Sequence, residues 1–190
     1  MIMNKRRFLL AASVSAAAVL TIAHLSRAAP PPAGDAGPAA EIQARWRDFL
    51  AAEANVTLDK TPLKRAHEQW RQTLPADSYA VLFEEDTEAP FSSHLNLEKR
   101  PGLFVCRACR LPLFSAEMKY ESGTGWPSFF THIVGHLATK KDFKIFLPRT
   151  EYHCVRCGGH QGHVFDDGPD PTRERWCNNG AALDFVPMKA

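Results

Sequence analysis

The five cysteines of this 190-residue chain fall into two close pairs and one singleton. Cys106 and Cys109 form one C-x-x-C knuckle, and Cys154 and Cys157 form a second. Four thiolates in two knuckles match the tetrahedral coordination of a structural Zn²⁺ ion, because each tight turn lets two sulfurs reach one metal. Two disulfides are the alternative in an exported protein, although a disulfide within a C-x-x-C is usually redox-active. The spacing favours one structural zinc per chain.

Cys177 has no cysteine left to pair with. Arg173 and Arg175 precede it, and cationic neighbours favour the thiolate, which is the nucleophilic form of cysteine. The alternative is a buried core cysteine, the common fate of an isolated thiol. The polar neighbours Asn178 and Asn179 are unusual for a plain core strand, so the pattern favours a reactive site.

Residues 1–28 predict an export signal. A basic segment over residues 5–7 precedes an apolar run over residues 8–25, and Ser-Arg-Ala at 26–28 offers a small-x-small cleavage site. The order Arg-Arg-Phe-Leu-Leu resembles the twin-arginine signal of bacterial folded-protein export. An ordinary unfolded-export signal and an uncleaved membrane anchor are the alternatives. We therefore expect the protein in the bacterial periplasm, or anchored in the membrane and facing the periplasm.

A Pro/Ala/Gly linker follows over residues 29–39, and residues 40–190 are long enough for one domain with a helical N-terminal extension. The formal net charge is +2, with basic residues spread among acidic ones, so we expect no nucleic-acid partner. We also expect a monomer. Because the periplasm oxidises thiols, folding around the metal before export would protect the knuckle thiolates.

Apolar residues recur every three or four positions over residues 40–74, which predicts two short helices. We expect Thr61 to cap the second helix, Pro62 to lie in its first turn, and Trp46 and Trp70 to cover a sheet. Short apolar runs separated by turn residues then predict antiparallel strands and knuckles at strand turns. These runs are YAVLF, GLFVC, LPLF, FKIFL, EYHC, GHVF and LDFV.

Two turn-rich segments carry side chains suited to chemistry. In ESGTGWPSFF, two glycines free the backbone beside Trp126. In GGHQGHVFDDGP, His160 and His163 precede a turn that contains Asp167. Each residue has an ordinary explanation: a core indole, surface or additional metal-binding histidines, and a turn aspartate. Their combination with the free thiol of Cys177 favours a site.

These motifs carry a family resemblance. GTGWPSF, CVRCGGHQGHVFDDGP, RERWCNNGAAL, TEAPFSS and the two knuckles closely resemble the B-type methionine sulfoxide reductases, from about Trp70 to Phe185. The resemblance implies a mostly β fold of two antiparallel sheets with a structural zinc. It also implies reduction of the R epimer of methionine sulfoxide, in oxidised proteins or peptides or as the free amino acid.

By the same resemblance, Cys177 is the nucleophile that passes through a sulfenic acid, and Trp126 is the wall for the substrate methyl group. A thiolate is a suitable nucleophile for sulfoxide sulfur once the oxygen is protonated, and imidazoles supply protons near neutral pH. The polar groups that match the family around nucleophile and sulfoxide oxygen are His160, His163, Asp167, Arg175 and Asn179.

The sequence departs from the family pattern at Thr124, where many relatives carry a resolving cysteine. The sulfenic acid is therefore expected to be reduced from outside, by a thioredoxin-like dithiol protein or, alternatively, by a small thiol. Smaller departures are Asn178 in place of an aliphatic residue, Gly180 in place of serine, and Trp176 in place of tyrosine or phenylalanine. Asn178 is expected to add a polar group beside the nucleophile.

Two other functions compete with this interpretation. A zinc-ribbon module could bind a protein partner with Cys177 incidental, because a fold does not determine function. Such a module has no reason to hold Cys177, Trp126 and two histidines jointly. A thiol-disulfide oxidoreductase that uses a C-x-x-C is disfavoured, because no thioredoxin-like βαβ pattern is present.

Overall fold

The computed structural model describes residues 37–144 and 148–188. The predicted export signal at 1–28 and most of the predicted linker lie outside the described residues. The helices are α1 (Pro38–Ala44), α2 (His67–Arg71) and α3 (Ala76–Glu84), with 3-10 helices η1 (Arg45–Phe49), η2 (His94–Leu97), η3 (Ala116–Met118) and η4 (Gly180–Ala182). The strands are β1 (Gly102–Cys106), β2 (Pro112–Ser115), β3 (Lys119–Tyr120), β4 (Ser128–Phe129), β5 (Leu137–Asp142), β6 (Arg149–Cys154), β7 (His160–Phe165), β8 (Arg175–Asn178) and β9 (Leu183–Pro187).

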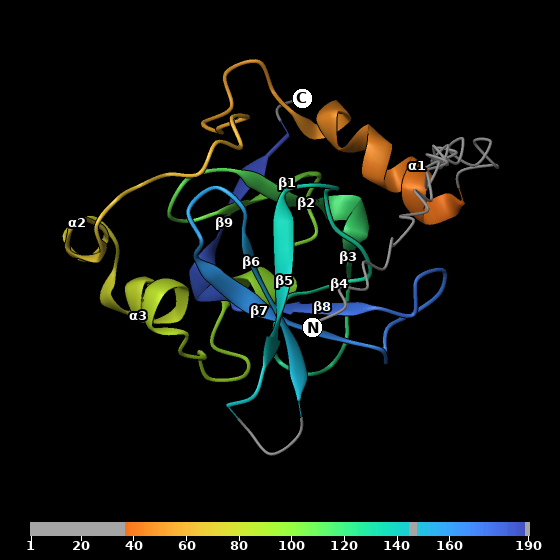
Figure 1. Ribbon diagram of the computed structural model, residues 1–190. Coiled ribbons are helices and arrows are strands. Elements are labelled where there is room, and N and C mark those ends of the chain that lie inside the picture. The colour runs from red at the N-terminus through yellow and green to blue at the C-terminus, as the bar shows by residue number, and fades with distance from the viewer. Residues whose placement is uncertain (1–36, 145–147, 189–190) are drawn as a thin grey trace, which may run out of the picture. The chain divides into compact units, whose positions relative to one another are not determined.

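Two antiparallel sheets form the centre of the fold (Figure 1). One has three strands in the order β2-β1-β9, and the other has six in the order β3-β4-β8-β7-β6-β5. The expected fold class, mostly β with two antiparallel sheets and short preceding helices, is confirmed. None of the helices within the described ranges is long and apolar enough to cross a membrane.

Aromatic side chains join the two sheets. Phe104 of β1 and Phe114 of β2 both pack on Phe129 of β4, with ring centroids 5.0 Å and 3.9 Å away. Tyr152 of β6 meets the edge of Phe114, and its side chain is fully buried. β1 and β2 are buried along their whole lengths, which explains why GLFVC and LPLF read as unbroken apolar runs.

The helical expectations need three corrections. The linker ends earlier than predicted, because Pro38 begins α1, where its fixed φ suits the first helical turn. The second helix does not begin at Pro62, because α2 begins at His67. Thr61 is therefore not its cap, and the Thr61 N–H donates to the Asp59 carboxylate in a turn. Residues 62–66, between Thr61 and α2, form no helix. The Leu63 N–H donates instead to the Arg156 carbonyl at the second knuckle.

The run YAVLF, predicted as a strand, lies in α3, which Pro75 precedes in an extended conformation. Tertiary packing decides this, because Trp70 of α2 stacks on Phe83 at 5.4 Å. Trp70 therefore covers a helix, whereas the helix that carries buried Trp46, η1, does pack against β1 and β2. Figure 1 shows α2 and α3 on one side of the strands and α1 on the other.

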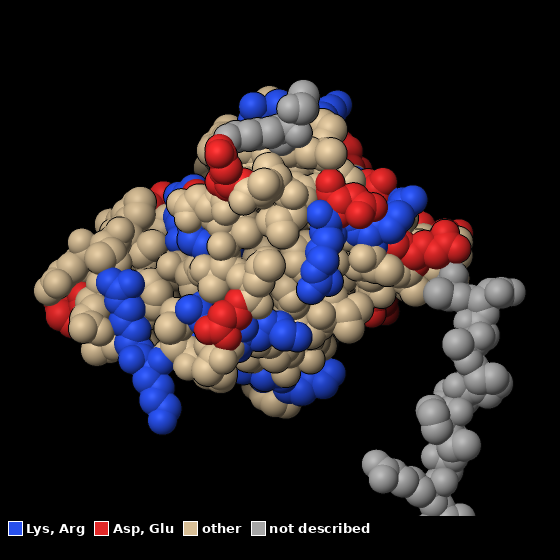
Figure 2. Space-filling model, turned by 90° about the horizontal axis from the view of Figure 1, so that it is seen from above, with Lys and Arg blue, Asp and Glu red and all other residues tan. Residues whose placement is uncertain are grey.

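The predicted strand over FKIFL is also wrong where it is described. β5 ends at Asp142, whose carboxylate accepts the N–H of Lys144, and exposed Phe143 lies outside the sheet. The rest of this run lies outside the described residues. On the face drawn in Figure 2, basic and acidic side chains are interspersed, in keeping with the small net charge of the sequence.

Candidate active site and metal centre

Strand β8 carries Cys177 between two neighbours. Cys177 pairs with Ser128 of β4 on one side and with His163 of β7 on the other. Directly opposite residues in an antiparallel ladder project their side chains to the same face. The sheet register therefore places an imidazole beside the unpaired thiol, which is half-buried.

Cys177 opens into a small pocket of about 130 Å³. Three of the predicted site residues, Trp126, His163 and Asn179, line the pocket with it. Asn178, expected to add a polar group beside Cys177, also lines the pocket. Sequence reasoning did not assign the remaining lining residues, which are Thr87, Arg149, Gly162 and Phe165.

The loop before β4 positions the Trp126 indole at this pocket. Gly125 has φ +94°, and an added Cβ there would lie 2.8 Å from the Pro90 side chain, so glycine suits this turn. The Trp126 Nε1 donates to the Glu88 carbonyl at 3.1 Å. The indole is thereby held in one orientation at the pocket wall.

Both predicted histidines are held by carboxylates that sequence reasoning missed. His160 is buried, and its Nδ1 lies 2.8 Å from Glu151 Oε1. His163 Nε2 lies 2.8 Å from Asp142 Oδ2. The two rings are 5.4 Å apart, and His160 borders a neighbouring groove of about 350 Å³ that also includes His163. The second ring nitrogen of each histidine remains for other partners.

Glu151 and Asp142, the carboxylate partners of the two histidines, both have lowered pKa values and are ionised. Burial opposes ionisation of Glu151, but the His153 ring 3.7 Å away and the hydrogen bond from His160 hold its pKa below the usual range. The pKa of Asp142 is lowered by hydrogen bonds from the Lys144 N–H and from His163. Since an ionised carboxylate only accepts, the ring nitrogen facing it carries the hydrogen in each pair.

Arg175 and Asp167 form a bidentate ion pair, with distances of 2.7 and 2.9 Å. Arg175 is buried over the Phe165 ring at 4.2 Å, whereas the Asp167 side chain is mostly exposed. Neither residue lines the pocket, but the Arg175 charge acts on the Cys177 thiolate. The pair flanks the site and holds a cation close to the Cys177 sulfur.

The electrostatics of Cys177 differ from the sequence expectation. Burial raises its pKa above the usual value, and Arg175 and a hydrogen bond from Thr124 only partly oppose this effect. Arg173, also expected to favour the thiolate, is exposed and does not contribute to the shift. Burial therefore disfavours the thiolate of Cys177, contrary to the expectation from its cationic neighbours.

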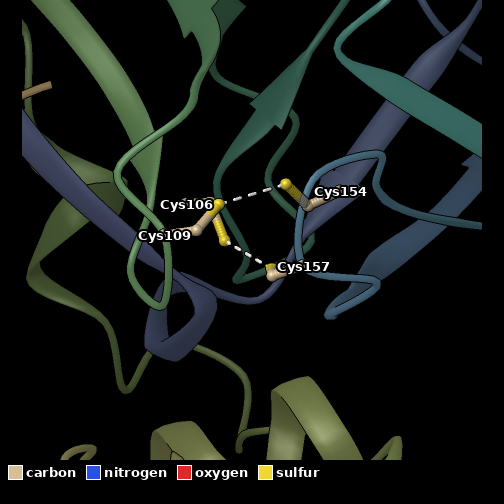
Figure 3. A group of neighbouring side chains, drawn as sticks. All are labelled: Cys106, Cys109, Cys154 and Cys157. Atoms are coloured by element: carbon tan, nitrogen blue, oxygen red, sulfur yellow. Dashed lines mark hydrogen bonds between the residues drawn. The ribbon is translucent and has the colours of Figure 1, made fainter. Parts of the chain in front are cut away.

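The four knuckle cysteines converge at one point, the β1–β2 turn supplying two and the β6–β7 turn the others (Figure 3). Their sulfurs all lie within 4.8 Å of one another. Cys106 and Cys157 sulfurs are 3.5 Å apart, as are those of Cys109 and Cys154. Disulfide sulfurs lie about 2 Å apart, so no disulfide is formed.

This cluster fits a tetrahedral metal ion. Zinc–sulfur bonds of about 2.3 Å place tetrahedral ligands about 3.8 Å apart, close to the spacings found here. Hydrogen bonds from the Cys106 and Cys109 thiols hold the pKa of Cys154 below the usual range. Gln161 Nε2 also donates to the Cys106 sulfur at 3.5 Å, a contact typical of the surroundings of thiolate ligands. The cluster links the two sheets.

The three departures from the family pattern have structural explanations. Asn178 lines the pocket but is fully buried, and its amide oxygen is engaged because it accepts the Tyr152 hydroxyl at 2.8 Å. An added Cβ at Gly180 would lie 2.0 Å from the Ser93 hydroxyl oxygen, so a serine there would require Ser93 to move. Trp176 packs on His132, with ring centroids 4.1 Å apart.

Two antiparallel sheets, joined at a four-cysteine cluster that could hold a metal ion, and a separate pocket around an unpaired thiol define a class of mostly β protein with a cysteine site. Residues 74–187 match the SelR domain, and the chain belongs to this family.

Three curated relatives bear the name peptide methionine sulfoxide reductase MsrB. The protein from Caulobacter vibrioides is 47% identical over 126 residues, 66% of this chain and 79% of its own length. That from Methanosarcina barkeri is 44% identical over 124 residues, 65% of this chain and 87% of its own. That from Bradyrhizobium diazoefficiens is 44% identical over 137 residues, 72% of this chain and 97% of its own.

Proposed function

We propose that this protein reduces methionine sulfoxide to methionine, acting on the R epimer in oxidised proteins and peptides. One observation carries the proposal: the pocket of Cys177 has an indole wall and, opposite the thiol in the ladder, an imidazole. The family and the names of its curated relatives support the same reaction class. An aromatic face suits a methyl thioether, and polar groups suit the sulfoxide oxygen.

The reaction balances with one thiol and one sulfoxide. The Cys177 sulfur attacks the substrate sulfur while the oxygen takes up a proton. The hydroxyl then moves from the substrate sulfur to the Cys177 sulfur, so that one sulfur–oxygen bond breaks and another forms. The transient bond between the two sulfurs breaks at the same time, methionine leaves, and Cys177 is left as a sulfenic acid. Cysteine sulfur is oxidised by two electrons, and the substrate sulfur is reduced by two.

Each site residue has a role in this scheme. Trp126 holds the methyl group of the substrate. His160 and His163 supply protons to the sulfoxide oxygen, with Asn179 as a hydrogen-bond donor to that oxygen. Arg175, oriented by Asp167, stabilises the thiolate as it forms.

Regeneration requires an external thiol. Thr124 is beside Cys177 where many relatives carry a resolving cysteine, and the other four cysteines form the metal cluster. A thioredoxin-like dithiol protein therefore attacks the sulfenic acid, releases water, and then resolves the mixed disulfide with its second thiol. Mass spectrometry of sulfoxide-treated protein should detect Cys177 sulfenic acid, and an internal disulfide would contradict this step.

The four-cysteine cluster is the site of a structural zinc ion. Cys106, Cys109, Cys154 and Cys157 would hold it, and the ion would supply only cross-linking of two hairpins. All-thiolate coordination leaves no open ligand position for substrate. One zinc per chain by elemental analysis is the expected result.

The protein is exported to the periplasm through the signal at residues 1–28, where protein-bound methionine sulfoxide would be the main substrate. A fusion of residues 1–40 to a reporter that only the unfolded-export route can carry tests the twin-arginine route. Efficient export of that reporter would count against it.

One assay tests the function as a whole. Each epimer of a methionine sulfoxide peptide is incubated with dithiothreitol and either wild-type protein or Cys177→Ser. We expect turnover of the R epimer by the wild type alone. Equal turnover of both epimers would contradict the epimer assignment, and retained turnover in Cys177→Ser would contradict the nucleophile.

A further inference from the structure

Residue Glu88 contacts both walls of the Cys177 pocket. Its backbone carbonyl accepts the Trp126 indole N–H at 3.1 Å, and its backbone N–H donates to Asn179 Oδ1 at 3.2 Å. Its carboxylate accepts the N–H groups of Gly180 at 2.5 Å and Ala181 at 2.8 Å. One residue thus joins segments that are 38 and 91 positions away in the sequence.

We propose that Glu88 is a positioning residue that sets the separation between the indole of Trp126 and Asn179 across the pocket. The inference rests on the proposed function, because it assigns the epimer selectivity of that same pocket to this connection. Without the carboxylate, the backbone N–H groups of the first two residues of η4, directly after Asn179, lose their acceptor.

The chain has few other means of fixing this geometry. Trp126 precedes the two-residue strand β4, and Asn179 follows the end of β8 as the N-cap of η4. The β4–β8 ladder aligns their backbones through Ser128 and Cys177, but it does not orient an indole or an amide side chain. Glu88 orients the indole through its carbonyl, and its N–H orients the Asn179 amide together with the Gln161 carbonyl, which accepts the amide Nδ2 at 3.1 Å.

The surroundings of the carboxylate suit a fixed structural charge. Glu88 is half-buried, and burial raises its pKa against the opposing effect of the Gly180 and Ala181 N–H groups. Arg107 of the first knuckle and Asp77 of α3 are the charged groups that act on it. A partly desolvated carboxylate with two backbone donors is costly to remove, because its partners remain buried.

The chemistry of a sulfoxide explains why this separation matters. The sulfur carries a methyl group, an oxygen and the rest of the side chain. The R and S epimers carry the same three groups and differ only in the handedness of their arrangement around the sulfur. Discrimination requires the apolar wall and the polar wall to stay at a defined distance. A looser pocket accepts both epimers more equally and binds the preferred one more weakly.

The test compares full-chain wild type with Glu88→Ala, Glu88→Gln and the control Glu117→Ala, which removes an exposed carboxylate paired with Arg45. Rates are normalised to titrated Cys177 thiol, so that a misfolded fraction does not lower them. For Glu88→Ala we expect KM for the R epimer to rise roughly tenfold, a smaller fall in kcat, and a lower ratio of R to S turnover. Glu88→Gln, which keeps an acceptor oxygen, should recover part of each effect.

A second readout needs no turnover. Hydrogen exchange of the Gly180 and Ala181 amides and of the Trp126 indole, followed by NMR, should accelerate in Glu88→Ala and stay at the wild-type rate in Glu117→Ala. Unchanged KM, epimer ratio and exchange in Glu88→Ala would overturn the proposal, as would a fall in active thiol alone. If wild type lacks sulfoxide turnover but exchange accelerates, the proposed function fails while the positioning contact stands.

Discussion

His163 lies directly opposite Cys177 in the β7–β8 ladder, and the outer nitrogen of its ring contacts Asp142. Burial lowers the pKa of His163, whereas the Asp142 carboxylate raises it. The net effect lowers the pKa of the imidazole beside the thiol, and the carboxylate limits how far this pKa falls. This balance determines when the ring can deliver a proton.

Replacing Asp142 with asparagine tests that balance. Asp142→Asn keeps the shape but removes the charge, so the pKa of His163 should fall further and sulfoxide turnover should drop on the order of tenfold or more. NMR titration of the His163 ring protons measures the first effect. Asp48→Asn, a change at an exposed carboxylate in η1, is the control and should move neither quantity.

Thr124 should influence the acidity of the nucleophile. Its hydroxyl lies near Cys177 and lowers the pKa of that thiol, against the larger effect of burial, which raises it. Thr124→Val keeps the volume but loses the hydroxyl, and should raise the pKa of Cys177 further. The rate of alkylation by iodoacetamide, measured against pH, should shift its midpoint upward, while Thr124→Ser should not. An unmoved midpoint in Thr124→Val would exclude this contact.

Gly180 and Ser93 should be energetically coupled. A side chain at Gly180 collides with Ser93, so Gly180→Ser should destabilise the protein by about 1–3 kcal/mol. Ser93→Gly alone loses the cap on η2 and should cost only a few tenths of a kcal/mol. The double variant should recover most of the loss, as measured by urea unfolding. Additive effects of the two changes would contradict the coupling.

His132 should make the protein less stable in acid. Burial lowers the pKa of His132 to about 4, from about 6.5 when exposed. Because the unfolded chain takes up the proton first, stability is lost as pH falls from 6.5 toward 4, by up to about 3 kcal/mol.

Unfolding free energies measured across this pH range check the effect. His132→Phe keeps the packing on Trp176 and should flatten this part of the stability profile. The exposed His67 provides the control, since His67→Gln should leave the profile unchanged. An equally steep profile in His132→Phe would show that other groups cause the acid sensitivity.

Metal removal should weaken the link between the two sheets. Chelation under reducing conditions, or Cys154→Ser, should lower the unfolding free energy by several kcal/mol, because metal binding and folding are coupled. Differential scanning calorimetry with elemental analysis measures both properties. Cys177→Ser, which leaves the cluster intact, should keep its metal and its Tm. Full stability of the metal-free chain would refute a structural role.

Much of the site follows from short spacings in the sequence. Cys106 and Cys109 converge because three positions span one tight turn, and the same holds for the second knuckle. Cys177 is identified as the singleton left by that pairing. Trp126 and the two histidines are recognisable because they stand in glycine-rich turns next to these motifs.

The partners of those residues arise from packing over long sequence distances. Glu151 and Asp142 reach the histidines through the registers of β5, β6 and β7, and Glu88 reaches Asn179 across 91 positions. No local pattern distinguishes these carboxylates from the other acidic residues of the chain. Packing between separate segments also explains why α3 was predicted as a strand. The run YAVLF is compatible with a helix or a strand, and the packing of Trp70 on Phe83 favours the helix.

Residue chemistry and the spacing of neighbours could thus be derived from the amino-acid order, because covalent geometry limits what two residues three positions apart can reach. That part includes the thiol cluster, the unpaired thiol and the mostly β class. The raised pKa of Cys177, the lowered pKa of His163 and the proposed role of Glu88 could not be derived, because each depends on burial and on contacts between distant segments. Those quantities exist only once the whole chain has packed and water has been removed from the pocket.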